Sequence, residues 1–261
     1  KGFYLVEGPS GSEFLILNTV ISHNDPATAK RGTFDQDRIS QLDEILTERS
    51  KKSTTNPSRQ RIVVMHHHPL LHSSTRFSSS DVLEFGDQLL SILQKHGFRF
   101  IVHGHRHEPR ITRVACSNKD QFVFAAGSFS AILKELSTST RNLFHLVKLG
   151  SLSSSNRLVG EIKTWEYNKG VGWRQSTSIS AALPHKAHFC SPRPIISVNK
   201  LKKECQKAVG SILRSAELKN KFPDLYLLLP DELTALGDEL SLHGIKLVLA
   251  DDGKPDYLGE F

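Results

Sequence analysis

The sequence predicts a mixed α/β fold of the α+β type, and three features of its 261 residues indicate it. Short apolar, β-like runs at 61–64 and 98–102 flank a stretch with helical spacing at 80–97. A histidine cluster directly follows each of these two runs. Farther along, 142–149 and 158–167 alternate apolar and polar residues as half-buried strands do, with a serine-rich hairpin loop between them. We therefore expect helices and strands to be mixed along the chain.

The two histidine clusters are expected at the same edge of one sheet. The helix between them is predicted by apolar residues at helical spacing, which are Val82, Phe85, Leu89, Leu90 and Leu93. Ser80 or Asp81 can cap its start, and Gly97 fits its end. Strand, histidines, helix, strand and histidines in this order form a β-α-β crossover, which makes the two strands parallel. Open α/β sheets usually bind ligands outside the carboxyl ends of such strands.

The histidine clusters are Met65-His66-His67-His68-Pro69 and His103-Gly104-His105-Arg106-His107. Neutral imidazole is a common ligand for ions of the Zn, Fe and Mn type. Either cluster alone is weak support for a metal site, because alternate residues of any extended chain point to the same side. Their pairing at one edge is what indicates a metal site.

The order of these motifs resembles the calcineurin-like metallophosphoesterase family. The family's late motifs, H-x-P and G-H-x-H after successive strands, match His67-His68-Pro69 and Gly104-His105-Arg106-His107. The strand 122–128 that ends in Ala-Gly-Ser, the strand 14–19 and the helix 34–46 are similar as well. The resemblance covers roughly residues 3–175. It implies a four-layer β-sandwich flanked by helices.

The family's early motifs, D-x-H, G-D-x-x-D and G-N-H-[DE], are not found in this sequence. In relatives they supply the metal-bridging aspartate, further metal ligands and a histidine that protonates the leaving group. The similar letters of Ser22-His23-Asn24-Asp25 have no preceding glycine. We therefore expect an incomplete sandwich, whose front half with the general-acid histidine is missing from the N-terminal side. A split protein, with that half on a separate chain, is the alternative.

The resemblance also assigns roles to the histidines. The complete site would hold two divalent ions, Mn, Fe or Zn, with His67 and His105 on one ion and His107 on the other. On an alternating strand the neighbours of His67 point away from it, so they are ambiguous. The candidates for substrate contact are His66, His68 and Arg106. The histidines outside the motifs are expected to be ordinary surface residues: His23, His72, His96, His145, His185, His188 and His243.

The chain is expected to divide into a phosphoesterase part at 1–180, a proline-containing linker at 181–194 and a partial α/β unit at 195–261. In the tail the pattern predicts a helix over 201–216 and another over 231–243, with strands at 225–229 and 245–249. This unit faintly resembles the back half of a restriction-endonuclease-like domain. Its catalytic D…E-x-K residues are absent from the sequence, so we expect an accessory or partner-binding unit, with a nuclease as the alternative.

Composition favours a cytoplasmic protein. No apolar run approaches 18 residues, so no membrane partner is expected, and the three cysteines are scattered. The net charge of +7 and the pI of about 9.3 suit a polyanionic partner or substrate. Nucleic acid could bind through the basic tail, although a solvated helix face explains the same lysines, which are Lys200, Lys202, Lys203 and Lys207.

The resemblance therefore predicts a hydrolase, a metal-dependent phosphoesterase that cleaves a phosphate mono- or diester with a metal-activated water. The run Val64–Pro69 is most similar to the cyclic-nucleotide phosphodiesterase branch, so a nucleotide is a candidate substrate. Because the early motifs are absent, we expect this chain alone to be inactive. The alternative is a non-catalytic metal-binding or scaffold module, such as a split subunit.

Overall fold

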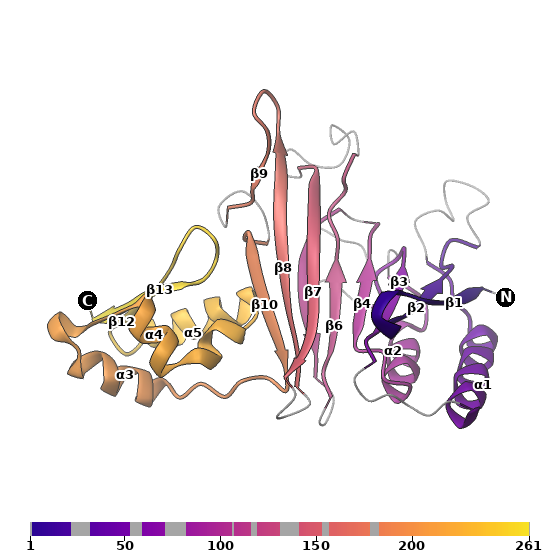
Figure 1. The fold of residues 1–261 in the computed structure, drawn as a ribbon, viewed down its shortest axis with the longest axis horizontal. Coiled ribbons are helices and arrows are strands. Elements are labelled where there is room, and N and C mark those ends of the chain that lie inside the picture. Colours follow the sequence, from indigo (N-terminus) through magenta and orange to yellow (C-terminus); the bar gives the residue numbers. More distant parts are fainter. Residues whose placement is uncertain are drawn as a thin grey trace. The chain divides into compact units, whose positions relative to one another are not determined.

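The computed structural model describes residues 2–21, 32–52, 59–70, 82–105, 107–115, 119–130, 141–152, 157–177 and 183–260. The chain divides into two compact units, Lys1–Ala126 and Gly127–Phe261. Helices and strands are mixed along the chain, so the predicted α+β class is confirmed (Figure 1). The four-layer sandwich and the domain limits at 180 and 195 stay predictions. No helix in the described part of the chain is long and apolar enough to cross a membrane.

The first unit is built on a six-stranded sheet with the order β1-β2-β3-β4-β6-β5. Its strands are β1 (Phe3–Glu7), β2 (Glu13–Leu17), β3 (Arg61–Met65), β4 (Phe100–His103), β5 (Arg110–Val114) and β6 (Gln121–Ala125). The four central strands β2, β3, β4 and β6 are parallel, and the edge strands β1 and β5 run antiparallel to their neighbours. The predicted β-α-β crossover is confirmed, because β3 and β4 pair in parallel with Met65 opposite His103.

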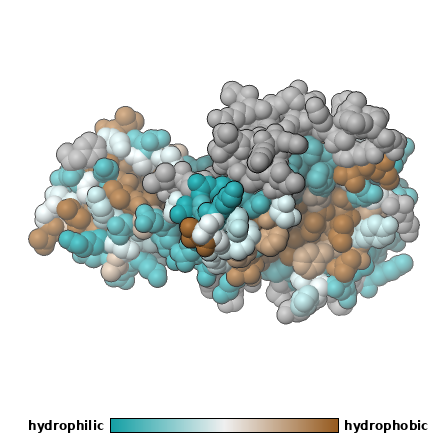
Figure 2. All heavy atoms as spheres, turned by 90° about the horizontal axis from the view of Figure 1, so that it is seen from above, coloured by the Kyte–Doolittle hydropathy of each residue, from teal (hydrophilic) through white to brown (hydrophobic). Residues whose placement is uncertain are grey.

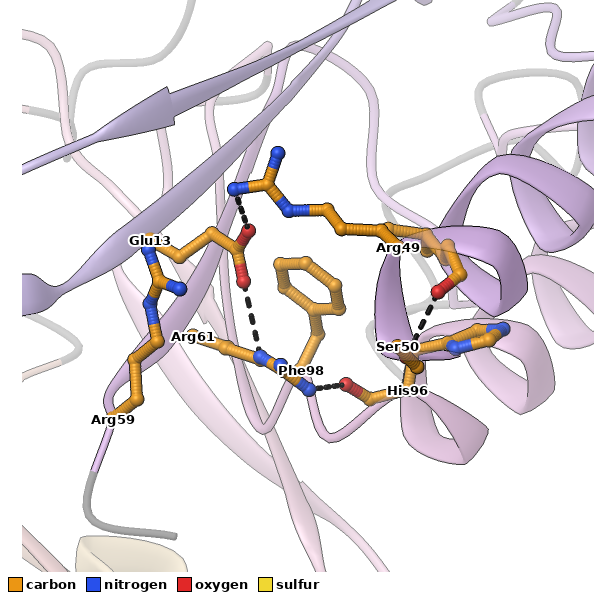
Figure 3. Close-up of a pocket in the computed structure, with 8 residues that line it drawn as sticks. Glu13, Arg49, Ser50, Arg59, Arg61, His96 and Phe98 are labelled. Carbon is orange, nitrogen blue, oxygen red and sulfur yellow. Dashed lines mark hydrogen bonds and ion pairs between the residues drawn. The ribbon is translucent and has the colours of Figure 1, made fainter. Parts of the chain in front are cut away.

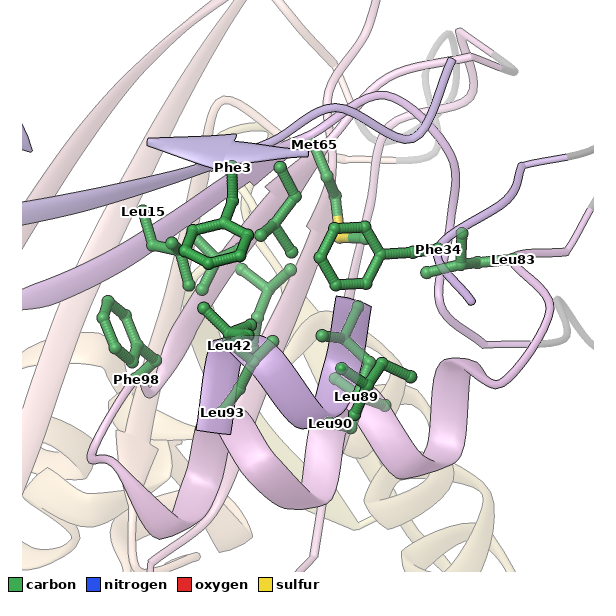
Figure 4. Close-up of a cluster of buried hydrophobic side chains, with 14 of the residues drawn as sticks. Phe3, Leu15, Phe34, Leu42, Met65, Leu83, Leu89, Leu90, Leu93 and Phe98 are labelled. Atoms are coloured by element: carbon green, nitrogen blue, oxygen red, sulfur yellow. The ribbon is translucent and has the colours of Figure 1, made fainter. Parts of the chain in front are cut away.

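Helices α1 (Gln36–Lys52) and α2 (Gly86–Lys95) bury their apolar sides against one face of this sheet (Figure 4). Leu42 of α1 and Leu89 and Leu93 of α2 are fully buried in that core. Helix α2 begins later than predicted, because residues 82–85 are not helical and Phe85 has a φ of 60°. Its first residue, Gly86, lies so close to the Pro69 carbonyl that a Cβ there would be 2.2 Å from the oxygen.

The opposite face of this sheet is less covered. Tyr4, Ile16 and Val64 lie in register on neighbouring strands and are 65%, 41% and 37% exposed. Hydrophobic side chains gather over this part of the chain in the right half of Figure 2. The two faces of the sheet therefore differ, with a packed helical side and an apolar side that is partly in solvent.

The second unit contains a sheet with the order β10-β8-β7, to which β9 adds by pairing with β8. Its strands are β7 (Leu143–Leu152), β8 (Arg157–Asn168), β9 (Gly172–Gln175) and β10 (Lys186–Ser191), all antiparallel. The predicted hairpin of β7 and β8 is confirmed.

Strand β10 falls inside 181–194, which the sequence predicted to be a linker. Ala187 and Phe189 of this strand are buried, and a Cβ on Gly160 of β8 would lie 2.1 Å from the Phe189 ring. The prolines of this stretch misled the prediction, because Pro184 and Pro192 flank the strand and do not interrupt it.

The tail of the second unit has its own core and a three-stranded antiparallel sheet with the order β11-β13-β12. Its elements are α3 (Val198–Lys207), β11 (Ile212–Arg214), α4 (Ser215–Lys221), a 3₁₀ helix (Pro223–Leu227), α5 (Pro230–Ser241), β12 (Ile245–Leu249) and β13 (Pro255–Glu260). On its visible face, at the left of Figure 2, hydrophobic and hydrophilic side chains are interspersed.

Two tail predictions are confirmed and two are wrong. Helix α5 and strand β12 lie where the pattern placed them. The helix predicted over 201–216 stops at Lys207, because Gly210 and Ser211 have φ angles of 65° and 54° that no α-helix accepts. The strand predicted at 225–229 is largely the 3₁₀ helix, because a short run of leucines fits a buried helical turn as well as a strand.

Candidate metal centre

Three histidines converge at the carboxyl ends of β3 and β4. The strands end side by side at Met65 and His103, and beyond them the Gly104 N–H donates to the His66 carbonyl over 3.1 Å. Ring nitrogens of His66, His67 and His105 all lie within 4.8 Å of one another. The ring centroids of His67 and His105, the pair predicted to share an ion, are 4.5 Å apart.

His66 does not point away from His67 as alternation predicted. Strand β3 ends at Met65, and the chain bends over the next two residues, so a two-residue period no longer applies. His66 Nε2 instead lies 3.1 Å from His105 Nδ1. His66 is exposed and His67 is fully buried, so the cluster reaches from the interior to the surface.

The second cluster also leaves the extended conformation. His105 and His107 have φ angles of 73° and 57°, which non-glycine residues adopt uncommonly and which often mark functional sites. Among the described residues His107 is not part of the group within 4.8 Å, and burial lowers its pKa below the ordinary value. His68 is buried with its ring 6.2 Å from that of His105. Arg106 lies outside the described residues.

His67 lies against two residues to which the sequence assigned no role. Its backbone N–H donates to Thr19 Oγ1 over 3.2 Å, and the same oxygen lies 3.0 Å from its Nδ1. Gly32 is also close, because a Cβ on it would lie 2.5 Å from the His67 Cγ atom. Thr19 follows the end of β2 at the same sheet edge, so the strand pattern could have placed it there. Gly32 leaves no local signal, because its close approach to the ring is a tertiary contact.

The Thr19 contact fits the ring form that metal binding requires. A Thr19 oxygen that accepts both the backbone N–H and an Nδ1–H group leaves the lone pair of His67 on Nε2. Metal-bound histidines usually donate their other ring N–H to an oxygen in this way, which fixes both the tautomer and the ring orientation.

The cluster has the donors for one ion. Two nitrogens bound at about 2.0–2.1 Å to one tetrahedral ion lie about 3.3 Å apart, close to the 3.1 Å between His66 and His105. In the described part of the chain no carboxylate joins the three imidazoles. The two ions implied by the resemblance therefore do not fit these residues, whereas one ion on three imidazoles leaves a fourth position for water or substrate.

A charged pocket lies at the opposite ends of the strands (Figure 3). Glu13, the first residue of β2, is almost fully buried and contacts Arg49 Nη2 and Arg61 Nε, each at 3.0 Å. Arg61 also donates to the His96 carbonyl over 2.5 Å. Arg59, which also lines the pocket, pairs with Glu7 over 2.8 Å, so each arginine of the pocket has a carboxylate beside it. We therefore interpret the pocket as a structural ion-pair network.

Two histidines predicted at the surface, His96 and His185, are buried instead, and His145 and His188 are half-buried. His96 contacts Asp43 over 2.6 Å, and Lys95 and His96 together lower the pKa of the Asp43 carboxyl. Burial lowers the pKa of His145 from 6.5 to about 4, and its Nε2 accepts from the Gly127 N–H. His243 is exposed as predicted. His23 and His72 lie outside the described residues.

Comparison with known proteins gives no family. No protein-family model matches the chain, and no curated protein matches its sequence. One similar solved structure is a Staphylococcus aureus protein provisionally assigned as a 5'-nucleotidase, in complex with alpha-ketoglutarate. It is 12% identical with a TM-score of 0.29, over 67% of this chain and 28% of that one. Another is GAP50, the anchor in the inner membrane complex of Plasmodium, 15% identical with a TM-score of 0.29, over 66% of this chain and 52% of that one. This chain thus spans about a quarter to a half of these structures, and TM-scores of 0.29 carry no functional conclusion.

Proposed function

We propose that this chain binds one divalent transition-metal ion through His66, His67 and His105, at a site that serves phosphoester hydrolysis. The convergence of three imidazoles at the carboxyl ends of adjacent parallel strands carries the proposal. This edge is where open α/β sheets place their ligands, and imidazole suits Zn, Fe and similar ions.

The protein's own residues have separate tasks in this site. Thr19 and Gly32 hold the buried His67 ring in one orientation, while the exposed His66 lies on the side that a substrate can reach. A bound ion would supply a Lewis acid and lower the pKa of a bound water. The net charge of +7 favours an anionic substrate, and the resemblance of Val64–Pro69 points to a phosphate diester of the cyclic-nucleotide type.

The second candidate is a metal-binding module without catalysis. Among the described residues, no carboxylate belongs to the group within 4.8 Å. This favours a non-catalytic module, because two-metal phosphoesterases need more ligands than three imidazoles. On this ground we expect negligible hydrolysis of bis(p-nitrophenyl) phosphate by this chain alone with Mn²⁺. Chelator-sensitive turnover would show that one ion is enough.

A spectroscopic test separates the two candidates without turnover. The chain is loaded with Co²⁺, and its visible spectrum is recorded before and after addition of inorganic phosphate. A site with an open fourth position binds phosphate and shifts the cobalt bands, whereas a closed structural site does not respond. His105→Ala should lose the bands, and His243→Ala, on an exposed histidine of the tail, should keep them. Bands that phosphate leaves unchanged would favour the non-catalytic module.

A further inference from the structure

The sheet of the second unit has one buried and one solvent-facing side. Along β8, Leu158, Ile162 and Thr164 are buried, while the residues between them are half-buried. Cross-strand pairing continues this division onto β7 and β9. We call the solvent-facing side the outer face; it carries Phe144, Leu146, Lys148, Glu161, Lys163, Trp165, Tyr167 and Trp173.

Aromatic rings gather at one end of the outer face. Phe144 and Trp165, opposite each other on β7 and β8, stack with centroids 4.6 Å apart and an interplanar angle of 5°. Trp173 of β9 meets Phe144 and Tyr167 edge-on, at 5.1 Å and 5.5 Å. Phe129, which precedes β7 in the chain, stacks on Trp173 at 5.3 Å and 17°.

These rings are exposed far more than rings of a core. Phe129, Tyr167 and Trp173 are 63%, 44% and 39% exposed. A parallel stack uses one side of each ring, so the high exposure of Phe129 leaves its other side in solvent. Exposed, stacked rings of this kind offer a further planar group a place to continue the stack.

Lysines lie among these rings. Lys163 is on β8 two residues before Trp165, Lys148 is on β7, and Lys169 is exposed in the turn after Tyr167. Glu161 is on the same face, but it lies 3.4 Å from His188 and 3.9 Å from Lys163. Protein–protein interfaces are enriched in aromatic residues and depleted of lysine, whereas nucleic-acid surfaces combine both.

We propose that the outer face binds single-stranded nucleic acid, with bases stacked on Phe129 and Trp173 and phosphates near Lys148, Lys163 and Lys169. Every base has a planar face, so such binding tolerates many sequences. This site needs no metal ion and is therefore independent of the function proposed for the histidine cluster. It also differs from the basic tail, which the sequence suggested as the nucleic-acid contact.

The test uses the full chain and a fluorescein-labelled oligothymidylate of about 15 nucleotides, a length that single-strand-binding folds cover. Anisotropy is measured with EDTA present, which removes any metal-dependent cleavage. We expect saturable binding that weakens as salt rises from about 50 to 200 mM, and weaker binding of a duplex of equal length. Phe129→Ala or Trp173→Ala should each weaken binding between about 5-fold and about 150-fold. In Lys163→Ala, the slope of log affinity against log salt concentration should become shallower by about 0.7.

Matched controls lie on the tail, which has a core of its own. Tyr257→Ala removes an aromatic ring that is 36% exposed, and Lys200→Ala removes an exposed lysine; both should bind as the wild type does. Because an alanine variant could lose its fold, Trp165→Phe is measured too, and quenching of the remaining Trp173 by the oligonucleotide reports direct contact. Unchanged affinity of folded Phe129→Ala and Trp173→Ala, absence of quenching, equal binding of the duplex, or loss of binding in Lys200→Ala would each overturn the proposal.

Discussion

Replacing Gly32 with alanine should damage the metal centre more than the fold. The new Cβ would lie 2.5 Å from Cγ, 2.6 Å from Cβ and 2.8 Å from Nδ1 of His67. Ordinary carbon contacts are about 3.5–4.0 Å, so the His67 ring must shift by about 1 Å. Nδ1 and Thr19 Oγ1 are 3.0 Å apart, and a shift of this size disturbs the geometry on which that hydrogen bond depends.

The two consequences can be estimated separately. Overpacking of a buried site costs about 1–3 kcal/mol of unfolding free energy, measurable by urea denaturation. Loss of the partner that orients a metal-bound histidine lowers metal affinity by about 10- to 100-fold, measurable by calorimetric titration with Zn²⁺. Thr19→Val, which removes the hydroxyl but keeps the shape, should reproduce the loss of affinity, and Thr19→Ser should restore most of it.

Gly237→Ala is the matched control. Gly237 lies inside α5, and a Cβ there meets nothing within 4 Å, so alanine should stabilise the helix by up to about 1 kcal/mol and leave metal affinity unchanged. A Gly32→Ala protein that binds Zn²⁺ as tightly as the wild type would refute the account of how His67 is positioned. A wild type that binds no Zn²⁺ would instead refute the metal centre itself.

Three further predictions follow from the described contacts. His66→Ala should lower Zn²⁺ affinity more than His107→Ala, because only His66 lies within 4.8 Å of the other two ligands; titrations showing the reverse order would restore the ligand set implied by the resemblance. Glu13→Gln should lower the free energy of unfolding by about 1–3 kcal/mol in urea, below the roughly 3–5 kcal/mol of a fully buried pair, because Arg49 is 41% exposed. His145 binds its proton less readily in the folded state, with a pKa of about 4 against 6.5, so the unfolded state takes up the proton first as pH falls. Stability should therefore decline between about pH 6.5 and pH 4, by up to about 3 kcal/mol, and a His145→Gln variant should show a smaller decline in thermal melts.

The sequence predicted those features that depend on hydrophobic periodicity over several residues. The crossover from β3 through α2 to β4 and the β7–β8 hairpin both have a long period-2 or helical signal. The tail helix over 201–216 failed at Gly210, where one left-handed residue ends a pattern that the apolar spacing alone continues. Periodicity also did not predict which polar residues are buried. Thr164 lies within hydrogen-bond distance of His145, and that partner belongs to another strand.

The candidate site shows the same limit at the scale of single residues. Both strand ends were predictable, and with them the edge at which the imidazoles gather. Which imidazoles face one another depends on the chain beyond Met65 and His103, where His66 follows a bend and His105 takes a φ of 73°. Alternation holds only while the backbone is extended, so it turned His66 away from His67, whereas His107 was chosen by the resemblance. A motif at a strand end therefore locates a candidate metal centre better than it assigns the candidate ligands, which depend on the loop conformation.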